Sequence, residues 1–248
     1  MLEKKEYKCD LHIHSCLSPC ADLLMTPGNI IKEALKLGLD CIAITDHNTA
    51  GNVEPALKIA QNNNLIVIPG MELESVEEVH LLCYFPGLAE MKEWELVVQS
   101  KLPALKNNEA VFGYQLLTDE SDEYIGKEER LLAVATKLSV SQIVEGVSLL
   151  GGVVVPAHVD KTVNSIIGQL GFLPPELNPG IIEISRNTEP FNLFKSHPQL
   201  KNLPYFRSSD SHYLLDIGSC GELYKGFCLG KHLLSKIYPL SCEENHEI

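Results

Sequence analysis

Cys9-Asp10-Leu11-His12-Ile13-His14-Ser15 is the stretch of sequence that decides the fold. Apolar side chains alternate along it, which predicts a short strand that runs into polar residues. His12 and His14 are two residues apart, so both imidazoles leave the same face of that strand. Such a pair can bind one divalent metal, although a His-x-His pair alone is more often structural or on the surface. The metal interpretation therefore depends on compatible side chains at the ends of other strands.

Two more buried strands follow, separated by helices. Thr26 as N-cap, Pro27 at the first helical position and Gly38 as a stop indicate the first helix. A strand is expected over residues 40–45, a helix over 53–60 and a third strand over 65–68 that ends at residues 69–72. This alternation predicts βαβ units in a parallel sheet. His47 and Glu72 follow the second and third strands, which is where α/β barrels hold their functional residues.

The remaining chain contains four more expected strands and one interruption. The strands lie over residues 79–85, 153–158, 180–186 and 205–212, and helices are expected over 141–150 and 231–238. Residues 86–139 do not continue the strand–helix alternation: a helical stretch is followed by an acidic, turn-rich one. The chain is therefore predicted to be a single α/β domain, residues 1–248, with an inserted or capping segment at about 86–139.

Composition limits the partners of this 248-residue chain. A formal net charge of −13 argues against a protein that binds long nucleic acid by neutralising its phosphates. Small phosphorylated substrates remain compatible, because bound cations reverse the local field. No apolar run approaches the length of a membrane span, and the polar residues 1–8 are unlike a signal peptide. We therefore expect a cytoplasmic protein that does not bind membranes, whereas the composition indicates nothing about oligomeric state.

The 8 cysteines do not form a disulfide pattern. Four of them lie in apolar runs, where buried free thiols are usual: Cys9, Cys41, Cys83 and Cys228. Cys16 and Cys20 form a Cys-x-x-x-Cys pair close to His14. Zinc binding by this pair is one interpretation, but no second cysteine pair completes a site, so the interpretation without metal is favoured.

Histidines and carboxylates concentrate at the ends of the expected strands, and six of the 9 histidines belong to this set. Six buried imidazoles would repel one another as cations unless they were neutral and bound to metal. The mixture of imidazole and carboxylate suits Zn, Mn or Fe, and so many ligands predict two to three divalent metal ions. The candidate ligands are His12, His14, Asp22, His47, Glu72, His80, His158, Asp210 and His212.

The order of these motifs resembles that of the PHP (polymerase and histidinol phosphatase) family. The motifs that carry the resemblance are Asp10-Leu11-His12-Ile13-His14-Ser15, Ile44-Thr45-Asp46-His47-Asn48, Pro69-Gly70-Met71-Glu72, Pro156-Ala157-His158 and Ser209-Asp210-Ser211-His212. The resemblance implies a distorted, seven-stranded TIM-like α/β barrel with a trinuclear metal centre at the C-terminal ends of the strands.

The resemblance also implies how the ligands are shared among three ions. His12, His14, Glu72 and Asp210 would bind the first, Glu72, His80 and His158 the second, and Asp22, His47 and His212 the third. Asp22 takes a loop position at which family members carry His or Asp. For His80, within an apolar run, the competing interpretation is a packed core histidine.

The expected chemistry follows from the metals. A hydroxide that bridges two ions is a nucleophile at neutral pH, and the ions also neutralise phosphate oxygens. We expect Glu72, which can bridge two ions, Asp210 and His158 to be the catalytic residues. Asp46 is expected to accept a hydrogen bond that orients an imidazole rather than to bind metal.

Basic side chains should contact the side of a phosphate that faces away from the metals. Lys161 and Arg186 are the expected substrate-binding residues, because each follows or ends an expected strand near the ligands. Arg207 is expected to lie inside its strand and to have no such role. Any of the three could instead form a surface salt bridge with one of the 33 acidic residues.

The leading functional interpretation is a metal-dependent phosphoesterase that hydrolyses a small phosphorylated substrate. The stand-alone branch of the family that the chain resembles implies a nucleotide or short oligonucleotide 5′-phosphate as the substrate class. A phosphatase of the histidinol-phosphate type is the second candidate within the family. Outside enzymes of this kind, the chain could be a non-catalytic metal-binding regulatory module or hold a closed structural metal site, and a full ligand set argues against both.

Overall fold

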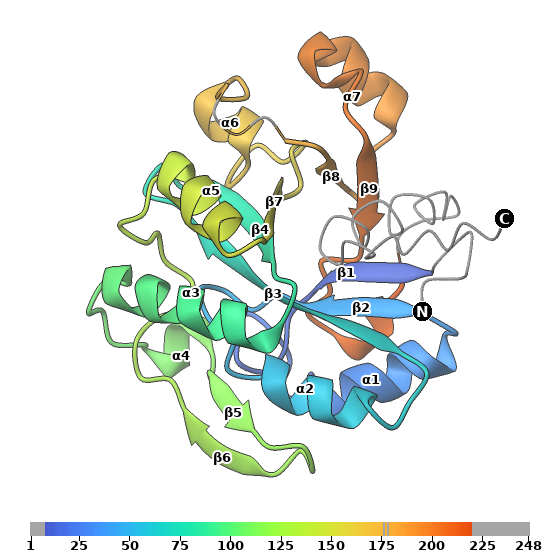
Figure 1. Cartoon of the computed structure of the whole chain (residues 1–248), viewed down its shortest axis with the longest axis vertical. Coiled ribbons are helices and arrows are strands. Elements are labelled where there is room, and N and C mark those ends of the chain that lie inside the picture. Colours follow the sequence, from blue (N-terminus) through green and yellow to red (C-terminus); the bar gives the residue numbers. More distant parts are fainter. Residues whose placement is uncertain (1–7, 176, 178, 220–248) are drawn as a thin grey trace, which may run out of the picture.

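A curled sheet of five strands forms the centre of the molecule, in the order β1-β2-β3-β4-β7 (Figure 1). The computed structural model describes residues 8–175, 177 and 179–219, so the helix expected over 231–238 lies outside the described residues. The five strands are β1 (Cys9–Ile13), β2 (Cys41–Ile44), β3 (Ile66–Glu74), β4 (His80–Tyr84) and β7 (Val153–Pro156).

Two further parallel strands, β8 (Ile182–Ser185) and β9 (Tyr205–Ser208), complete the curve. The hydroxyl of Ser208 accepts a hydrogen bond from the Leu11 amide at 3.2 Å, and the Ser211 carbonyl accepts one from the His14 amide at 3.0 Å. These bonds hold the end of β9 and the residues after it against β1, so segments from the two ends of the described chain meet at one edge. The predicted distorted, seven-stranded TIM-like α/β barrel is confirmed.

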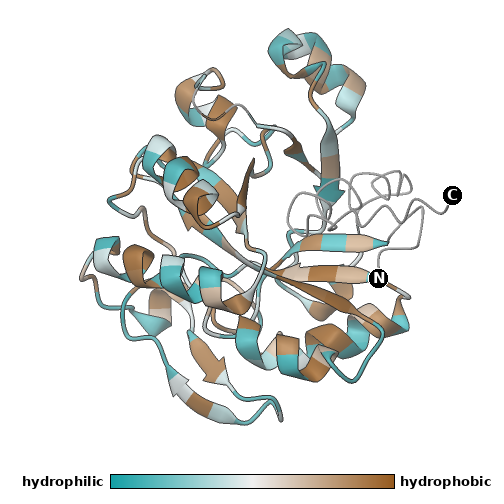
Figure 2. Cartoon of the chain, in the orientation of Figure 1, coloured by the Kyte–Doolittle hydropathy of each residue, from teal (hydrophilic) through white to brown (hydrophobic). Residues whose placement is uncertain are grey.

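The sheet has an apolar layer on each face, as expected of strands that are covered on both sides. Along β2, Cys41 and Ala43 join the apolar residues inside the curve, whereas Ile42 and Ile44 pack against the outer helices. All four are fully buried. Figure 2 shows β2 and β3 as mostly hydrophobic, whereas the helices around the sheet carry both hydrophobic and hydrophilic residues.

β1, β2 and β3 are parallel, as predicted, but β4 runs antiparallel to both of its neighbours. Residues 75–79, which join β3 to β4, are too few for the crossover that a parallel connection needs. Because β4 is reversed, its first residue lies at the edge where the other strands end. His80 therefore reaches the same edge as the histidines that follow the parallel strands.

β3 is longer than expected and does not end at Pro69. It pairs with β2 over residues 66–69 and then with β4 over residues 70–74. The Pro69 carbonyl accepts a hydrogen bond from the Phe85 amide at 2.9 Å, which extends the β3–β4 pairing to the residue at which the β2 pairing ends. Glu72 thus lies within a strand rather than in a loop after one.

Helices cover the outside of the sheet (Figure 1). The Thr26 hydroxyl caps the first of them and Pro27 is its first residue, as predicted. Ser139 and Gln142 form a capping box at the start of the helix predicted over 141–150. These outer helices are α1 (Pro27–Lys36), α2 (Val53–Ala60), α5 (Val140–Leu149), α6 (Ile166–Leu170) and α7 (Pro190–Ser196), with short 3-10 helices at Pro198–Leu200 and Leu214–Asp216.

The segment between β4 and β7 contains α3 (Leu88–Lys101), α4 (Glu109–Phe112) and a separate hairpin of β5 (Leu116–Thr118) and β6 (Tyr124–Lys127). The hairpin projects away from the central sheet (Figure 1). Its strands were not predicted, because β6 is largely exposed and lacks an alternating apolar pattern. The buried Trp94 of α3 packs against Gly146 of α5 and holds the segment on the barrel.

Candidate metal centre

The carboxylate of Glu72 lies at the centre of the candidate site, within 3.4 Å of five imidazoles. Glu72 itself is buried. The nearest contacts are those of His80 Nδ1 at 2.9 Å and His47 Nδ1 at 3.1 Å. The other contacts are from the Nε2 atoms of His12 at 3.3 Å, His158 at 3.3 Å and His14 at 3.4 Å.

Asp210, which follows β9, adds a second carboxylate to the cluster. Its Oδ1 lies 3.4 Å from Nε2 of both His12 and His14. Its Oδ2 accepts a hydrogen bond from Lys161 Nζ at 2.6 Å. Asp210 and His158 both have positive φ angles, 50° and 29°, which residues other than glycine rarely adopt. Backbone strain of this kind concentrates at functional sites.

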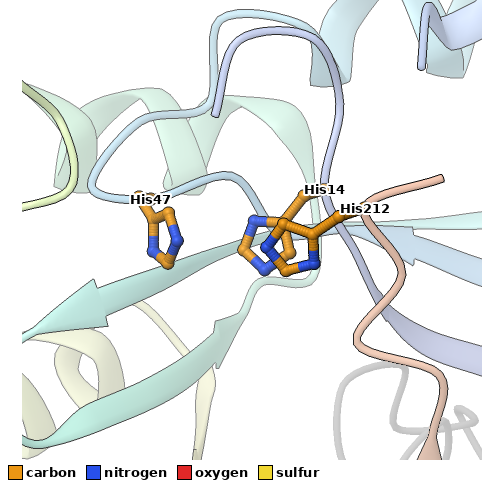
Figure 3. A group of neighbouring side chains, drawn as sticks. All are labelled: His14, His47 and His212. Carbon is orange, nitrogen blue, oxygen red and sulfur yellow. The ribbon is translucent and has the colours of Figure 1, made fainter. Parts of the chain in front are cut away.

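His14, His47 and His212 come from three different segments and face one another (Figure 3). The ring centroids of His14 and His212 are 4.4 Å apart and those of His14 and His47 are 4.5 Å apart. One ring nitrogen from each lies within 4.8 Å of the other two. Three neutral imidazoles at this spacing are a suitable donor set for a divalent transition metal.

Among the described residues, two other groups have ligand atoms within 4.8 Å of one another. They are His12, His14 and Asp210, and His47, Glu72 and His80. The first of these agrees with the grouping implied by the family resemblance. The other two groups differ from that grouping by one residue each. His14, and not Asp22, lies with His47 and His212. His47, and not His158, lies with Glu72 and His80.

Eight of the nine predicted ligands therefore converge, and Asp22 is the exception. Its Oδ1 accepts a hydrogen bond from the Leu24 amide at 2.9 Å, a local turn at the surface. None of the three ligand groups in the described part of the chain includes it. Cys20, two residues earlier, is not in any of these groups either.

Glu183, behind the cluster, contacts two of its histidines. Glu183 Oε1 lies 3.0 Å from Nδ1 of His12, and Glu183 Oε2 accepts the His158 amide at 2.8 Å. Glu183 is a functional residue that the sequence pattern did not predict. The available signal was a single glutamate in an otherwise apolar strand, since a buried carboxylate needs partners.

His14 is oriented by a different pair of residues, Ser18 and Asp46. Asp46 accepts hydrogen bonds from the hydroxyls of Ser15 at 2.5 Å and Ser18 at 2.6 Å, and Ser18 Oγ lies 2.9 Å from Nδ1 of His14. Because Ser18 donates its only proton to Asp46, it accepts from His14 Nδ1 and leaves Nε2 of that ring available to the cluster. Asp46 thus orients His14 through a serine rather than contacting an imidazole directly.

The buried charges shift the pKa values in opposite directions. Burial disfavours the charged form of Glu72, but His80, His12 and His47 outweigh this and hold its pKa well below the usual range. Burial, together with His212 and His47, lowers the pKa of His14 well below 6.5. Burial raises the pKa of the Cys20 thiol, but the contacts with His212 and His47 dominate and lower it to about 6.

These residues fit a group of divalent metal ions. His14 is held neutral, which is the form that binds metal, and the carboxylates of Glu72 and Asp210 are held ionised. The buried Nδ1 of His158 has no hydrogen-bond partner within the described residues. The mixture of imidazole nitrogen and carboxylate oxygen is the donor chemistry of Zn, Mn and Fe sites.

A pocket of about 160 Å³ opens onto the cluster. Lys161 lines it, as expected of a substrate-binding residue, together with His47, Glu72, His80, His158, Val163, Asn164, Asp210 and His212. Arg186 is not among the lining residues and lies 3.4 Å from Asp216, with which it forms an ion pair. Arg207 lies within β9, as predicted, and donates to the Thr188 carbonyl.

The fold and the site together define an α/β barrel whose strand ends hold a buried cluster of histidines and carboxylates. The chain belongs to the PHP domain family, whose model matches residues 10–162. It is 34% identical to the 5′-3′ exoribonuclease Rnm of Escherichia coli over 73 residues, which are 29% of this chain and 24% of that protein. The match thus spans about a quarter of that relative.

Solved structures show the same fold at lower sequence identity. Endonuclease Q of Pyrococcus furiosus aligns with 84% of this chain and 49% of its own, at 20% identity and a TM-score of 0.60. An amidohydrolase of Chromobacterium violaceum aligns with 92% of this chain and 96% of its own, at 17% identity and a TM-score of 0.61. Within the described residues, no helix is both long and apolar enough to cross a membrane.

Proposed function

We propose that this chain is a metal-dependent phosphoesterase. The observation that carries the proposal is the position of Glu72, a buried carboxylate surrounded by five imidazoles and open to a pocket. A charged carboxylate in that position is suited to bridge two ions. The proposed ligands of two to three divalent ions are His12, His14, His47, Glu72, His80, His158, Asp210 and His212.

The chain's own residues would prepare the site for this chemistry. Divalent ions at such a site lower the pKa of water and neutralise charge on phosphate oxygens. Glu72, Asp210 and His158, the proposed catalytic residues, line the pocket and would position the reacting phosphate beside the ions. Lys161 Nζ, now bonded to Asp210, would contact a phosphate oxygen from the pocket side.

We propose a nucleotide or short oligonucleotide with a 5′-phosphate as the substrate class. A pocket of about 160 Å³ accommodates a phosphate group better than a whole nucleotide, so the base and sugar would lie outside it. A net charge of −13 disfavours a long nucleic-acid footprint. The similarity to a 5′-3′ exoribonuclease supports a substrate with a 5′ end, whereas Endonuclease Q has been crystallised with a 27-mer duplex.

The segment 86–139 is proposed to help select the substrate. It lies against the loops that carry the site, because Asn48 Nδ2 donates to the carbonyls of Leu132 at 2.7 Å and Val134 at 2.9 Å. The Leu116 amide donates to the Cys16 carbonyl at 2.9 Å, next to the loop after β1. A substitution that moves this segment would therefore also move the loops at the rim of the site.

Phosphate release with Mn²⁺ present tests the proposal. The substrates are nucleoside bisphosphates, short 5′-phosphorylated RNA, histidinol phosphate and a chromogenic phosphodiester. We expect release from the nucleotide substrates, loss of at least about 100-fold in Asp210→Ala, and no change in Glu93→Ala, an exposed residue of α3. A metal-loaded protein that releases phosphate from none of these substrates would contradict the proposal and favour a non-catalytic module.

A further inference from the structure

The loop between β7 and α6 forms one wall of the pocket at the metal centre. Three of its residues, Lys161, Val163 and Asn164, line the pocket together with residues of the cluster. Lys161 contributes a cation, and Val163 an exposed apolar side chain. Asn164 contributes an amide, which can both donate and accept hydrogen bonds. Lys161 has a place in the proposed function, whereas Asn164 does not.

Hydrogen bonds fix the backbone of this loop. The Lys161 amide donates to the His158 carbonyl at 2.9 Å, and the Ser165 hydroxyl donates to the Lys161 carbonyl at 2.5 Å. The Ser165 hydroxyl also accepts the Gly168 amide at 2.9 Å, which joins the loop to α6. Gly168 packs so closely that a Cβ there would be 2.5 Å from the Thr162 carbonyl oxygen. The loop therefore presents its side chains to the pocket from a well-supported backbone.

Asn164 is held against the proposed metal ligand His80. The His80 amide donates to the Asn164 carbonyl at 3.0 Å, and the φ angle of Asn164 is 56°. Asparagine adopts this left-handed conformation more readily than most residues do, and glycine adopts it at still lower cost. The backbone conformation alone would be met by glycine at least as well, so it does not account for the amide side chain.

The side-chain amide of Asn164 is available to a ligand. It has no hydrogen-bond partner within residues 8–175, 177 and 179–219. Two other asparagines beside the site use their amides within the protein: Asn48 Nδ2 donates to two carbonyls and Asn52 Nδ2 to the Ser15 hydroxyl. An amide with unused hydrogen-bonding capacity in the wall of a polar pocket is suited to contact whatever the pocket binds.

We propose that Asn164 is a substrate-binding residue whose amide donates a hydrogen bond to a phosphate oxygen in the pocket. This inference rests on the phosphoesterase of the proposed function. A pocket of about 160 Å³ accommodates a phosphate group, so a side chain in its wall would meet the phosphate rather than the rest of the substrate. Phosphate oxygens are strong acceptors, so the amide would present Nδ2 to them. Lys161 supplies a point charge, and Asn164 would add a directed hydrogen bond.

Binding of inorganic phosphate to the metal-loaded, full-length protein tests the proposal without catalysis. Isothermal titration compares the wild type with Asn164→Gly and Asn164→Asp. Glycine keeps the backbone conformation and removes the amide, whereas aspartate keeps the shape and replaces the donor with a charged acceptor. We expect the phosphate affinity to fall on the order of tenfold in Asn164→Gly and further in Asn164→Asp. The KM of the preferred phosphoester should rise in the same order, with a smaller change in kcat.

Glu78→Gly is the matched control. Glu78 also has a positive φ angle, 58°, but its side chain is exposed and is not part of the pocket wall. This variant should bind phosphate as the wild type does. Elemental analysis of every variant measures its metal content. A loss of metal in Asn164→Gly would show that Asn164 supports His80 instead, and would overturn its role in phosphate binding.

The remaining outcomes separate this role from the proposed function. Wild-type phosphate affinity in Asn164→Gly or in Asn164→Asp would overturn the role of Asn164, and so would a metal-loaded wild type that binds no phosphate. If the wild type still releases phosphate from the substrate panel, the phosphoesterase proposal stands in each of these cases. A wild type that binds phosphate through Asn164 but hydrolyses none of the substrates would contradict only the phosphoesterase proposal.

Discussion

Glu183 Oε1 lies 3.0 Å from Nδ1 of His12, although the two residues are 171 positions apart. A carboxylate only accepts hydrogen bonds, so Nδ1 of His12 carries the proton and, in the neutral ring, Nε2 faces Glu72 and Asp210 with a free lone pair. The same carboxylate fixes the His158 amide at 2.8 Å. One buried residue of β8 thus sets the direction of two proposed ligands.

Glu183→Gln should weaken metal binding without unfolding the protein. The amide keeps the shape of the side chain but loses the charge that supports the His12 tautomer. We expect a loss of about 10–100-fold in metal affinity and a similar fall in activity. Isothermal titration with Mn²⁺ measures the first, and the exposed Glu93→Gln on α3 is the control. Equal affinities for the two variants would contradict the orienting role.

Ser18→Ala should destabilise the fold as well as the site. The substitution leaves the buried Asp46 without a 2.6 Å donor and His14 Nδ1 without an acceptor. We expect a loss of about 1–3 kcal/mol in the free energy of unfolding, measured by urea denaturation of the metal-free protein. Ser148→Ala, on the exposed face of α5, should change it by less than about 0.5 kcal/mol. Equal changes in the free energy of unfolding for the two serine variants would contradict the hydrogen bonds that link Asp46, Ser18 and His14.

Lys161→Ala and Arg186→Ala should have different effects. Lys161 lines the pocket and its ammonium lies 2.6 Å from Asp210, so its removal should raise KM on the order of tenfold. Arg186 pairs with Asp216 outside the lining residues, so we expect its removal to leave KM nearly unchanged. Steady-state kinetics with the preferred phosphoester decides between these roles. A larger KM effect in the arginine variant would reverse the assignment.

Chelation should lower the unfolding temperature of the metal-loaded protein. The cluster holds six histidines and two carboxylates, most of them buried, and bound ions offset their mutual repulsion. Free metal at about 1,000 times its Kd adds about 4 kcal/mol to the free energy of unfolding. Removal of the metal should therefore lower the unfolding temperature by on the order of 10 °C. Differential scanning fluorimetry before chelation, after it and after Mn²⁺ is restored measures the change. An unchanged transition, with metal removal verified by elemental analysis, would argue against a metal site.

Gly146→Ala tests how the 86–139 segment is held. A Cβ at Gly146 would lie 2.1 Å from the Trp94 ring, so α3 or α5 must move. We expect a destabilisation of about 1–3 kcal/mol by urea denaturation. Gly126→Ala is the control, since its Cβ would meet Leu117 only at 4.0 Å. Equal stability of the two alanine variants would contradict the contact between Trp94 of α3 and Gly146 of α5.

The sequence by itself determined the barrel class and most of the side chains that meet in the cluster. Short apolar runs that end in His or Asp predicted both the strands and the edge at which they meet, because local hydrophobic periodicity specifies where a strand lies. The helix start at Thr26 was an equally local signal. Eight of the nine candidate ligands converge in the folded chain for this reason.

Only the tertiary structure decided what depends on distant pairing. The reversal of β4 brought His80 to the common edge, and the closure of the barrel brought Glu183 of β8 to His12 of β1. The path of one loop turned the Asp22 carboxylate toward the Leu24 amide and away from the cluster. A sequence pattern gives the period of side chains along an element but not the partner across space, so these relationships became visible only in the folded chain.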